Sequence, residues 1–420
     1  PAVARPLATR DTVMWPLCVA ASSGLVLPAA SGSAPASIAA SPLRVAAHPL
    51  LQAPPAVYSP SKDLAGRGAK YYDGRPPELS QSIAQALKEV GKRKICVITG
   101  ASSGLGLHAV TALTSSYEGY YVIAAVRDTA KMDEAAAEMG IDAKDYKAVK
   151  LECASLASVR DFSKELKRLL RGRGLDRLVC NAAVYLPTDP KPRFTDEGYE
   201  MSFGVNHLSH FLLLQLLMPD LKKAKDARVC IVGSVTGNKN TVAGSLVKPV
   251  ADVGDLEGVK AGAGSVMVDG SRSFDGAKAY KDAKALNMMT VLEAHRRLHP
   301  STGIVFNSMY PGCIAQTQLF REKRDWFRYF FFPTLMKAIG SYVSQKEAGE
   351  RLAQTIADPQ AAKSGVYWSW NGDAKSIGVG NAGGAGGDLF ENSFSGMVQD
   401  EANGQLCWDY SMELVKPYLK

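Results

Sequence analysis

The stretch Lys94–Gly106, KICVITGASSGLG, decides the fold class of this chain. Its first six residues are apolar and β-branched enough to predict a buried strand, and an apolar helical pattern follows to about Ser116. Gly100, Gly104 and Gly106 lie between the two, where a tight turn brings the backbone close to a pyrophosphate without a Cβ in the way. The N–H groups that open the helix can then bind phosphate. The stretch therefore predicts a dinucleotide site.

The same alternation of strand and helix continues toward the end of the chain. Helices are expected at Ala130–Met139 and Leu156–Leu170. Further strands are expected at residues 120–127, 146–152, 177–182, 228–234, 303–311 and 365–370. Nearly continuous apolar strands separated by helices indicate a parallel sheet covered on both faces. We therefore expect a Rossmann-type, doubly wound α/β fold with its ligand at the carboxyl ends of the strands.

Composition narrows the class of protein. With 46% apolar and 21% charged residues, the chain resembles an ordinary globular enzyme. Its net charge is +8, and no Lys/Arg cluster is interleaved with aromatic residues, so no nucleic-acid partner is expected. The seven cysteines include no CxxC pair, and Cys96, Cys180 and Cys230 lie in apolar strand-like runs. This pattern favours a reducing compartment and predicts neither a disulfide framework nor a metal site.

The second expected strand ends in Arg127, where a site specific for NAD usually carries an acidic residue. An arginine at this position can pair with a 2′-phosphate, which selects NADPH. Lys131, one helical turn further on, can add a second positive charge. The alternative is a surface arginine at a strand end. The pattern favours NADPH as the cofactor.

A YxxxK motif, Tyr280–Lys284, places both side chains on one face of a helix. A tyrosine alone has a pKa near 10 and is a poor acid–base group at neutral pH. A lysine ammonium one turn away favours the phenolate and brings the tyrosine closer to a useful range. Because the motif is common, a solvated helix face is its ordinary reading. Its position after the glycine loop, with Asn181, Asn206 and Ser234 in between, favours catalysis.

This ordered set of motifs resembles the short-chain dehydrogenase/reductase family, over residues 94 to 370. The resemblance implies that Asn206 holds a proton-relay water, that Ser234 hydrogen-bonds the reacting group, and that Tyr280 and Lys284 complete the catalytic set. It implies a cofactor site formed by Gly100, Ser102, Ser103, Gly104, Leu105, Gly106, Arg127, Lys131, Glu152, Cys153, Asn181, Ala182, Ala183, Val205, Tyr280, Lys284, Pro311 and Gly312.

The spacing within the catalytic set points to one branch of that family. About a dozen residues usually separate the serine from the tyrosine, whereas Ser234 and Tyr280 are 46 positions apart. An insertion of this kind resembles the light-dependent protochlorophyllide oxidoreductases of plastids and cyanobacteria. Further similar stretches are CNAAVY (180–185), VGSVTGN (232–238), VADVGDLEG (250–258), AYKDAK (279–284), HRRLHPSTGIVFNSMYPGCIAQTQLFRE (295–322) and SGVYWSWNGD (364–373).

The resemblance implies light-driven reduction of the C17=C18 double bond of protochlorophyllide with NADPH. The pigment would absorb the photon, a hydride would reach C17, and Tyr280 would deliver or organise the proton for C18. A short-chain reductase of another bulky hydrophobic substrate is one alternative. A pigment-binding structural paralogue with low turnover is another.

The N-terminal segment differs from the rest in composition. Residues 1–70 are rich in Ala, Ser and Pro, with no acidic residue between Asp11 and Asp63. Thr12–Ala30 is apolar enough for a signal-peptide core. We expect a plastid-targeting leader over residues 1–70, with a disordered tail as the alternative. A linker with a short helix is expected over 71–91, and a single NADPH-binding reductase domain over 92–420, in the stroma or on the thylakoid.

Several positions depart from the family pattern. The family usually has YKDSK with a cysteine two positions after the lysine, and this chain has Ala283 and Leu286 there. The family's cysteine lies near the pigment, so Leu286 bears on turnover. Glu152–Cys153 replaces a common Asp-Leu beside the adenine.

Two segments near the C-terminus are harder to place. Residues 374–400 are glycine-rich and are expected to be a flexible loop. Residues 326–336, WFRYFFFPTLM, carry six aromatic residues. They predict a cover for the pigment or a membrane contact, and an ordinary buried helix is the alternative. A homo-oligomer is also possible.

Overall fold

The computed structural model describes residues 90–117, 119–241, 244–245, 247–312, 314, 316, 319, 326–338, 342–371 and 386–420. The expected leader and nearly all of the expected linker therefore lie outside the described residues. The first described residue is Val90. From there the description covers one α/β unit.

One eight-stranded sheet forms the centre of the molecule, in the order β3-β2-β1-β4-β5-β6-β7-β8. All neighbours pair in parallel except β7 and β8, which are antiparallel. The strands are β1 (Lys94–Thr99), β2 (Tyr120–Val126), β3 (Tyr146–Lys150), β4 (Arg177–Cys180), β5 (Arg228–Val232), β6 (Val305–Met309), β7 (Val366–Trp370) and β8 (Leu389–Asn392). The expected doubly wound fold is confirmed, and the order of strands reverses between β1 and β4.

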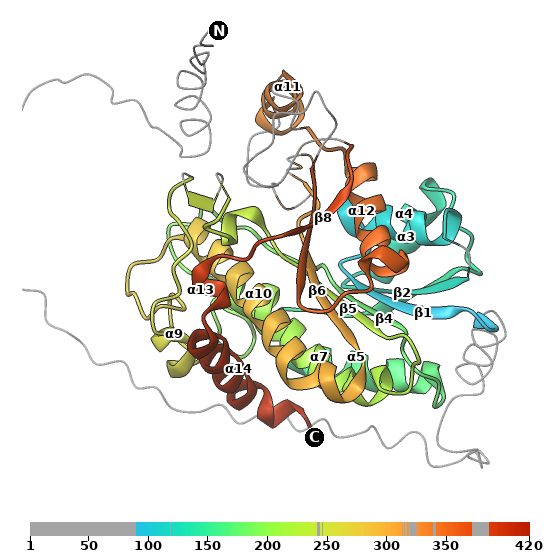
Figure 1. Cartoon of the computed structure of the whole chain (residues 1–420), viewed down its shortest axis with the longest axis horizontal. Coiled ribbons are helices and arrows are strands. Elements are labelled where there is room, and N and C mark those ends of the chain that lie inside the picture. Colours follow the sequence, from blue (N-terminus) through green and yellow to red (C-terminus); the bar gives the residue numbers. More distant parts are fainter. Residues whose placement is uncertain are drawn as a thin grey trace, which may run out of the picture.

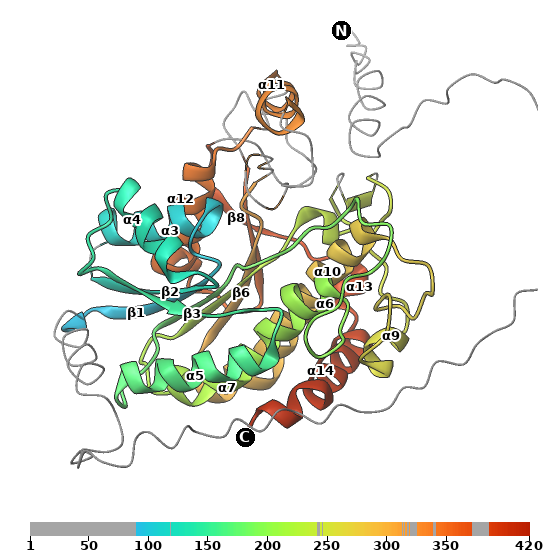
Figure 2. The same cartoon turned by 180° about the vertical axis from the view of Figure 1, so that it is seen from behind.

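Helices cover both faces of this sheet (Figure 1). One face carries α3 (Gly104–Ser115), α4 (Thr129–Glu138) and α12 (Gln345–Ala357). The other carries α5 (Leu156–Leu170), α7 (Ser209–Leu221) and α10 (Gly276–Thr302), as Figure 2 shows from behind. The short elements between β4 and α10 are α6 (Met201–Phe203), the π-helix η2 (Gly204–Leu208), the 3₁₀ turn η3 (Val235–Gly237) and α9 (Glu257–Ala261).

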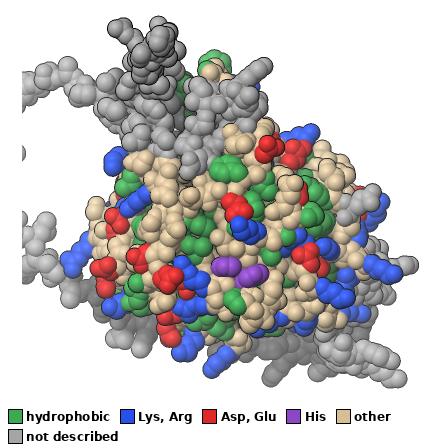
Figure 3. Space-filling view, viewed as in Figure 1, with side chains coloured by type: hydrophobic (Ala, Val, Ile, Leu, Met, Phe, Trp, Pro, Cys, Tyr) green, Lys and Arg blue, Asp and Glu red, His purple; other side chains and the backbone are tan. Residues whose placement is uncertain are grey.

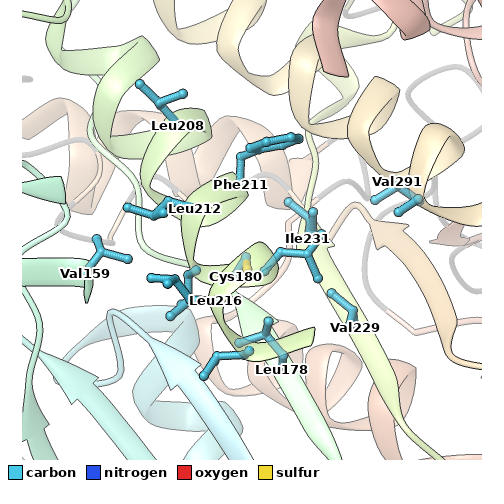
Figure 4. Packing of buried hydrophobic residues seen from close by; sticks show 14 of the residues in the cluster. Val159, Leu178, Cys180, Leu208, Phe211, Leu212, Leu216, Val229, Ile231 and Val291 are labelled. Atoms are coloured by element: carbon cyan, nitrogen blue, oxygen red, sulfur yellow. The ribbon is translucent and has the colours of Figure 1, made fainter. Parts of the chain in front are cut away.

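The core beneath the sheet depends on α7, which is apolar nearly all round. Leu212 and Leu216 of α7 lie toward Val159 of α5, and Phe211 lies toward Ile231 of β5 (Figure 4). A helix with this pattern must be buried on most of its surface, and eleven of its thirteen residues are buried. The π-helix η2 leads directly into it and is therefore held in the interior.

The C-terminal part departs from the sequence expectation. Residues 374–400 were expected to form a flexible loop, but 389–392 form β8, which pairs with β7 at the edge of the sheet. The segment continues into α13 (Gly396–Gln399), α14 (Glu401–Val415) and the turn η7 (Lys416–Tyr418). The flexible-loop prediction is wrong for these residues, because pairing with β7 supplies order that the local sequence lacks. Residues 372–385 lie outside the description.

The aromatic segment forms the π-helix η5 (Trp326–Phe331), followed by α11 (Phe332–Ala338), which stands apart from the body of the molecule (Figure 1). Trp326, Tyr329 and Phe330 are 57%, 54% and 72% exposed. The alternative of an ordinary buried helix is therefore wrong. In the part of the chain that the structure describes, no helix is both long and apolar enough to cross a membrane.

The charged side chains form no large patch of one sign on the face drawn in Figure 3, and the described cysteines form no disulfide. On the face drawn in Figure 3, acidic and basic side chains are interspersed. Among the described residues, five cysteines are buried free thiols, namely Cys96, Cys153, Cys180, Cys230 and Cys407. Within the same residues no group of three or more His, Cys, Asp and Glu side chains is placed to hold a metal ion.

The contact between α3 and α12 yields a test of the fold. A Cβ at Gly349 would lie 2.3 Å from the Cβ of His108, so Gly349→Ala should lower the free energy of unfolding by roughly 1–3 kcal/mol. This sign opposes the intrinsic preference of helices for alanine. Gly396→Ala is the control, because nothing lies within 4 Å of its Cβ position. Equal urea-unfolding curves for the two variants would contradict this packing.

Candidate active site

The glycine-rich loop joins β1 to α3, as the sequence predicts. Gly100 and Gly104 have φ values of +68° and +53°, which glycine tolerates best. A Cβ at Gly106 would lie 2.4 Å from the carbonyl oxygen of Gly100 and 2.8 Å from Nδ2 of Asn181. The cap of α3 makes no side-chain bond to the helix within the described structure, so the first N–H groups suit a phosphate. Half-buried Ser102, Ser103 and Leu105 complete the loop.

The hydroxyl of Thr99 joins this loop to the end of β4. Its Oγ1 accepts hydrogen bonds from the backbone N–H groups of Asn181 and Ala182, both at 2.9 Å. The Asn181 side chain donates in return to the Thr99 carbonyl oxygen at 2.8 Å. The structure thus brings the predicted residues Asn181 and Ala182 against Gly100, with half-buried Ala183 next in sequence.

The residues expected around the adenosine lie at the carboxyl ends of β2 and β3. Arg127 and Lys131 are exposed, and Asp128 between them caps α4 by accepting from the Lys131 N–H. The Glu152 carboxylate accepts from the Ala154 N–H at 2.9 Å. Cys153 is buried, and burial raises the pKa of its thiol to about 12, so it is an inert neutral group.

The YxxxK pair lies on α10, which begins at the cap residue Asp275. Lys284 is buried, and its Nζ donates to the Val232 carbonyl oxygen at 2.7 Å and lies 5.8 Å from the centre of the Tyr280 ring. Burial lowers the pKa of Lys284 to about 8. The lysine is therefore mainly an ammonium at neutral pH and loses that charge as the pH rises through about 8.

Ser234 follows β5 and faces the start of the insertion. It is 9% exposed, and its Oγ lies 2.9 Å from Oγ1 of Thr236. A Cβ at Gly237 would lie 3.0 Å from the Lys281 carbonyl oxygen, so the turn η3 packs closely on α10. The structure therefore places Ser234 next to α10, with the hydroxyl of Thr236, which the sequence analysis did not single out, beside it.

Asn206 lies in the π-helix η2 and is fully buried. Its Oδ1 accepts from the Val184 N–H at 2.7 Å, and its Nδ2 donates to the Val184 carbonyl oxygen at 2.9 Å. The next residue, Tyr185, packs edge-to-face on Tyr280 with ring centres 5.0 Å apart. Tyr185 was also missed, because the sequence shows no spacing that links it to the YxxxK motif.

The remaining predicted cofactor residues lie around the same edge of the sheet. Val205, beside Asn206, is buried in the core beneath the sheet. Pro311 follows β6, and its carbonyl oxygen accepts from Arg351 at 3.1 Å. Gly312 has a φ of +122°, and a Cβ there would lie 2.6 Å from a methyl group of Val343. Both features fix the turn after β6.

The insertion between Ser234 and Tyr280 is held by α10 itself. Nζ of Lys281 donates to the carbonyl oxygens of Val247 and Pro249. Asp282 is buried and accepts from the Asp252 N–H at 2.8 Å and from Lys278 at 2.6 Å, and burial raises its pKa to about 7. Lys281 and Asp282, which lie between Tyr280 and Lys284 in the YxxxK motif, therefore anchor the insertion. Sequence reasoning assigned them no role.

An open cavity of about 660 Å³ lies at the opposite end of the sheet. It is lined by residues at the start of β1 and β2, among them Lys92, Tyr117 and Tyr120. The cavity therefore lies away from the glycine loop, Ser234 and the turn Pro311–Gly312, which follow the carboxyl ends of β1, β5 and β6.

Comparison with known proteins agrees with this geometry. The family model for short chain dehydrogenase matches residues 94–246. Protochlorophyllide reductase A of rice, a chloroplastic protein, is 48% identical over 334 residues, covering 78% of this chain and 82% of the relative. The Chlamydomonas reinhardtii protein of similar name is 47% identical (77% and 78% covered), and the oat protein is 49% identical (76% and 99% covered). The chain belongs to the protochlorophyllide reductase family.

Solved structures resemble this family member more distantly. An NADPH-bound carbonyl reductase from chicken fatty liver has a TM-score of 0.46 and 19% identity, and covers 66% of this chain and 95% of its own. A likeness of that degree does not extend to function.

The two departures from the family motif, Ala283 and Leu286, are both fully buried on α10. Leu286 belongs to the core cluster beneath the sheet, and its carbonyl oxygen lies 3.9 Å from the Cys407 thiol of α14. This position is therefore part of the protein interior and shows no surface to an open site.

Burial at this position predicts the effect of restoring the family's thiol. Leu286→Cys should lower the free energy of unfolding by roughly 1–3 kcal/mol, because buried carbon atoms are removed. The turnover rate of the folded protein should stay within about twofold of its original value, because a buried thiol is a weak proton donor. Urea unfolding and single-turnover kinetics would measure both quantities. A severalfold faster turnover at unchanged stability would contradict the assignment.

Proposed function

We propose that this protein reduces protochlorophyllide to chlorophyllide with NADPH, in a light-driven step, in the chloroplast. The observation that carries the proposal is the geometry of α10. This helix presents Tyr280 and Lys284 to the cofactor edge of the sheet, and it anchors the long insertion with Lys281 and Asp282. The rice and Chlamydomonas relatives are chloroplastic protochlorophyllide reductases, and they are 48% and 47% identical to this chain over 334 and 328 residues.

The glycine loop and the strand ends supply the cofactor site. When bound, NADPH would supply the hydride for C17 and would itself be oxidised to NADP⁺. Gly100 and Gly106 leave the backbone open to the pyrophosphate, since Cβ atoms there would fill that space or meet Asn181 and Ala182. Exposed Arg127 directly follows β2 and exposed Lys131 lies in the first turn of α4, where the two can pair with a 2′-phosphate. The turn Pro311–Gly312 bounds the nicotinamide end.

The catalytic pair supplies the proton. The C17=C18 double bond accepts a hydride at C17 and a proton at C18, so both atoms become saturated. Tyr280 gives its phenolic proton to C18, and the resulting phenolate is stabilised by the ammonium of Lys284, 5.8 Å from the ring centre. The Val232 carbonyl oxygen holds that ammonium in place. Ser234 and Thr236 offer paired hydroxyls to polar groups of the pigment.

A flash experiment tests this function. In darkness the protein with NADPH should bind protochlorophyllide, and a flash should then convert its red absorption band to that of chlorophyllide. Tyr280→Phe should bind pigment and slow proton transfer by roughly 100-fold. If pigment binds the original protein but no chlorophyllide forms, the chain is a pigment-binding protein without turnover. If pigment does not bind, the substrate is another bulky hydrophobic molecule.

We propose in addition that the aromatic segment Trp326–Ala338 contacts the thylakoid membrane. Four of its aromatic side chains are exposed, which is unusual for a surface that only meets water. Aromatic rings suit the boundary between lipid headgroups and acyl chains. Exposed Lys337, above the Tyr342 ring at 4.9 Å, adds a positive charge that anionic lipid attracts.

Vesicle flotation tests the membrane contact. The double variant Trp326→Ser, Phe330→Ser should lose most binding to galactolipid vesicles that contain phosphatidylglycerol, because it removes apolar surface. Phe194→Ser is the matched control, since Phe194 is 41% exposed elsewhere on the molecule. Unchanged flotation of the double variant would contradict the proposal. A change in its molar mass by light scattering would assign the segment to contact between copies of the chain.

A further inference from the structure

The backbone carbonyl of Asn206 is the centre of a buried hydrogen-bond network. Its oxygen accepts from Nδ2 of Asn287 at 2.9 Å and bonds to Nδ1 of His210 at 3.1 Å. A carbonyl oxygen has two lone pairs, so it can bind both of these side chains. Asn206, Asn287 and His210 are all no more than 1% exposed, so water does not compete for these bonds.

The His210 branch leads to the nucleotide loop, and its direction follows from its acceptors. Because the Asn206 oxygen can only accept, Nδ1 of His210 carries the proton and Nε2 is an acceptor. Nε2 lies 2.9 Å from Oγ1 of Thr99, so the Thr99 hydroxyl donates to it. Burial lowers the pKa of His210 to about 3 and keeps the ring neutral, as this arrangement requires.

The Asn287 branch leads to the C-terminal helix. Since Nδ2 of Asn287 donates to Asn206, its Oδ1 faces Nδ1 of His207 at 3.3 Å and accepts from it. Nε2 of His207 then accepts from the Ser411 hydroxyl of α14 at 2.9 Å. Burial lowers the pKa of His207 to about 4, so this ring is neutral as well. The Asn206 carbonyl oxygen can only accept, so the Asn287 amide must turn its Nδ2 toward it and its Oδ1 toward His207.

The network reaches the proton donor through Asn206. The Asn206 side chain holds both backbone groups of Val184, and the adjacent Tyr185 ring packs on Tyr280. Any shift of the π-helix η2 would therefore move Val184 and loosen the ring that orients the phenol. The predicted cofactor-binding part of the site is formed by other elements, namely the glycine loop and the turn after β6.

We infer that Asn287 is a positioning residue for proton transfer: its amide holds the Asn206 carbonyl, and through Val184 and Tyr185 it fixes the orientation of Tyr280. The inference rests on the proposed function for the reaction it serves. Asn287 stands three positions after Lys284 on α10, so the catalytic helix carries both the proton donor and the group that positions it.

Kinetics after a flash separate this role from a merely structural one. Because light starts all molecules together, hydride and proton transfer can be followed as successive absorbance changes. Asn287→Ala should slow proton transfer roughly tenfold, since small misplacements of reacting groups are costly, and should leave hydride transfer and NADPH affinity within about twofold. Asn307→Ala is the matched control, a buried amide on β6 that donates to Ala361 at 3.4 Å.

Asn287→Asp gives a second, pH-dependent readout and covers the case in which the alanine variant does not fold. A carboxylate at this position would face the Asn206 oxygen without a proton to donate, whereas a carboxylic acid would restore the bond. Proton transfer in this variant should therefore be slow at high pH and recover as the pH falls, relative to the original protein at each pH. A rate loss independent of pH, or equal losses in both chemical steps, would overturn the inference.

Hydrogen–deuterium exchange tests the positioning without any turnover. Peptides that contain Val184 and Asn206 should exchange faster in Asn287→Ala than in Asn307→Ala. Failure of the original protein to form chlorophyllide would refute the proposed function and leave this measurement valid. Unchanged exchange, or unchanged proton transfer in an active protein, would refute the role of Asn287 alone.

Discussion

The hydroxyl of Thr99 is the contact on which the site depends. It lies at the end of β1, where the order of strands reverses, and it accepts two backbone N–H groups from the end of β4. It also donates to His210 of α7, so one oxygen joins two strands and a helix. A valine of the same shape would fill the space but leave the N–H groups of two half-buried residues, Asn181 and Ala182, without this acceptor, which is costly. The glycine loop can approach Asn181 closely only because this oxygen holds the two strand ends together.

Different residues of the helix α10 contact different parts of the molecule. Tyr280 and Lys284 serve the site, Lys281 and Asp282 hold the insertion, and Asn287 joins the core network. Burial lowers the pKa of Lys284 to about 8 and keeps it close to the range in which a proton can be exchanged. One helix therefore sets the relative positions of the proposed proton donor Tyr280, its cationic partner Lys284 and the insertion. Loops carrying the same groups would hold them less accurately.

The sequence predicted the parts of the molecule that carry local patterns. The expected strand at 94–99 and the helix at 156–170 have the same bounds as β1 and α5, because apolar periodicity reports burial directly. The strand at 389–392 was missed, since its order comes from pairing with β7 and not from its own residues. Sequence patterns did not identify Asn287 and Tyr185 for a similar reason. Their partners lie about 80 or more positions away, so no spacing connects them to the motifs.

The positions of Ala283 and Leu286 in the structure explain what these two departures from the family motif change. Ala283 and Leu286 are fully buried, whereas Tyr280 is only half-buried and faces the site. A leucine in place of a thiol adds apolar contacts to the core cluster, and Cys407 of α14 lies against the same turn of helix. An interior exchange of this kind changes packing and stability and leaves the reacting groups in place. Under the proposed function, the chemistry depends on the hydrogen-bonded residues around Tyr280, in which Asn206 and Lys284 are held by backbone groups.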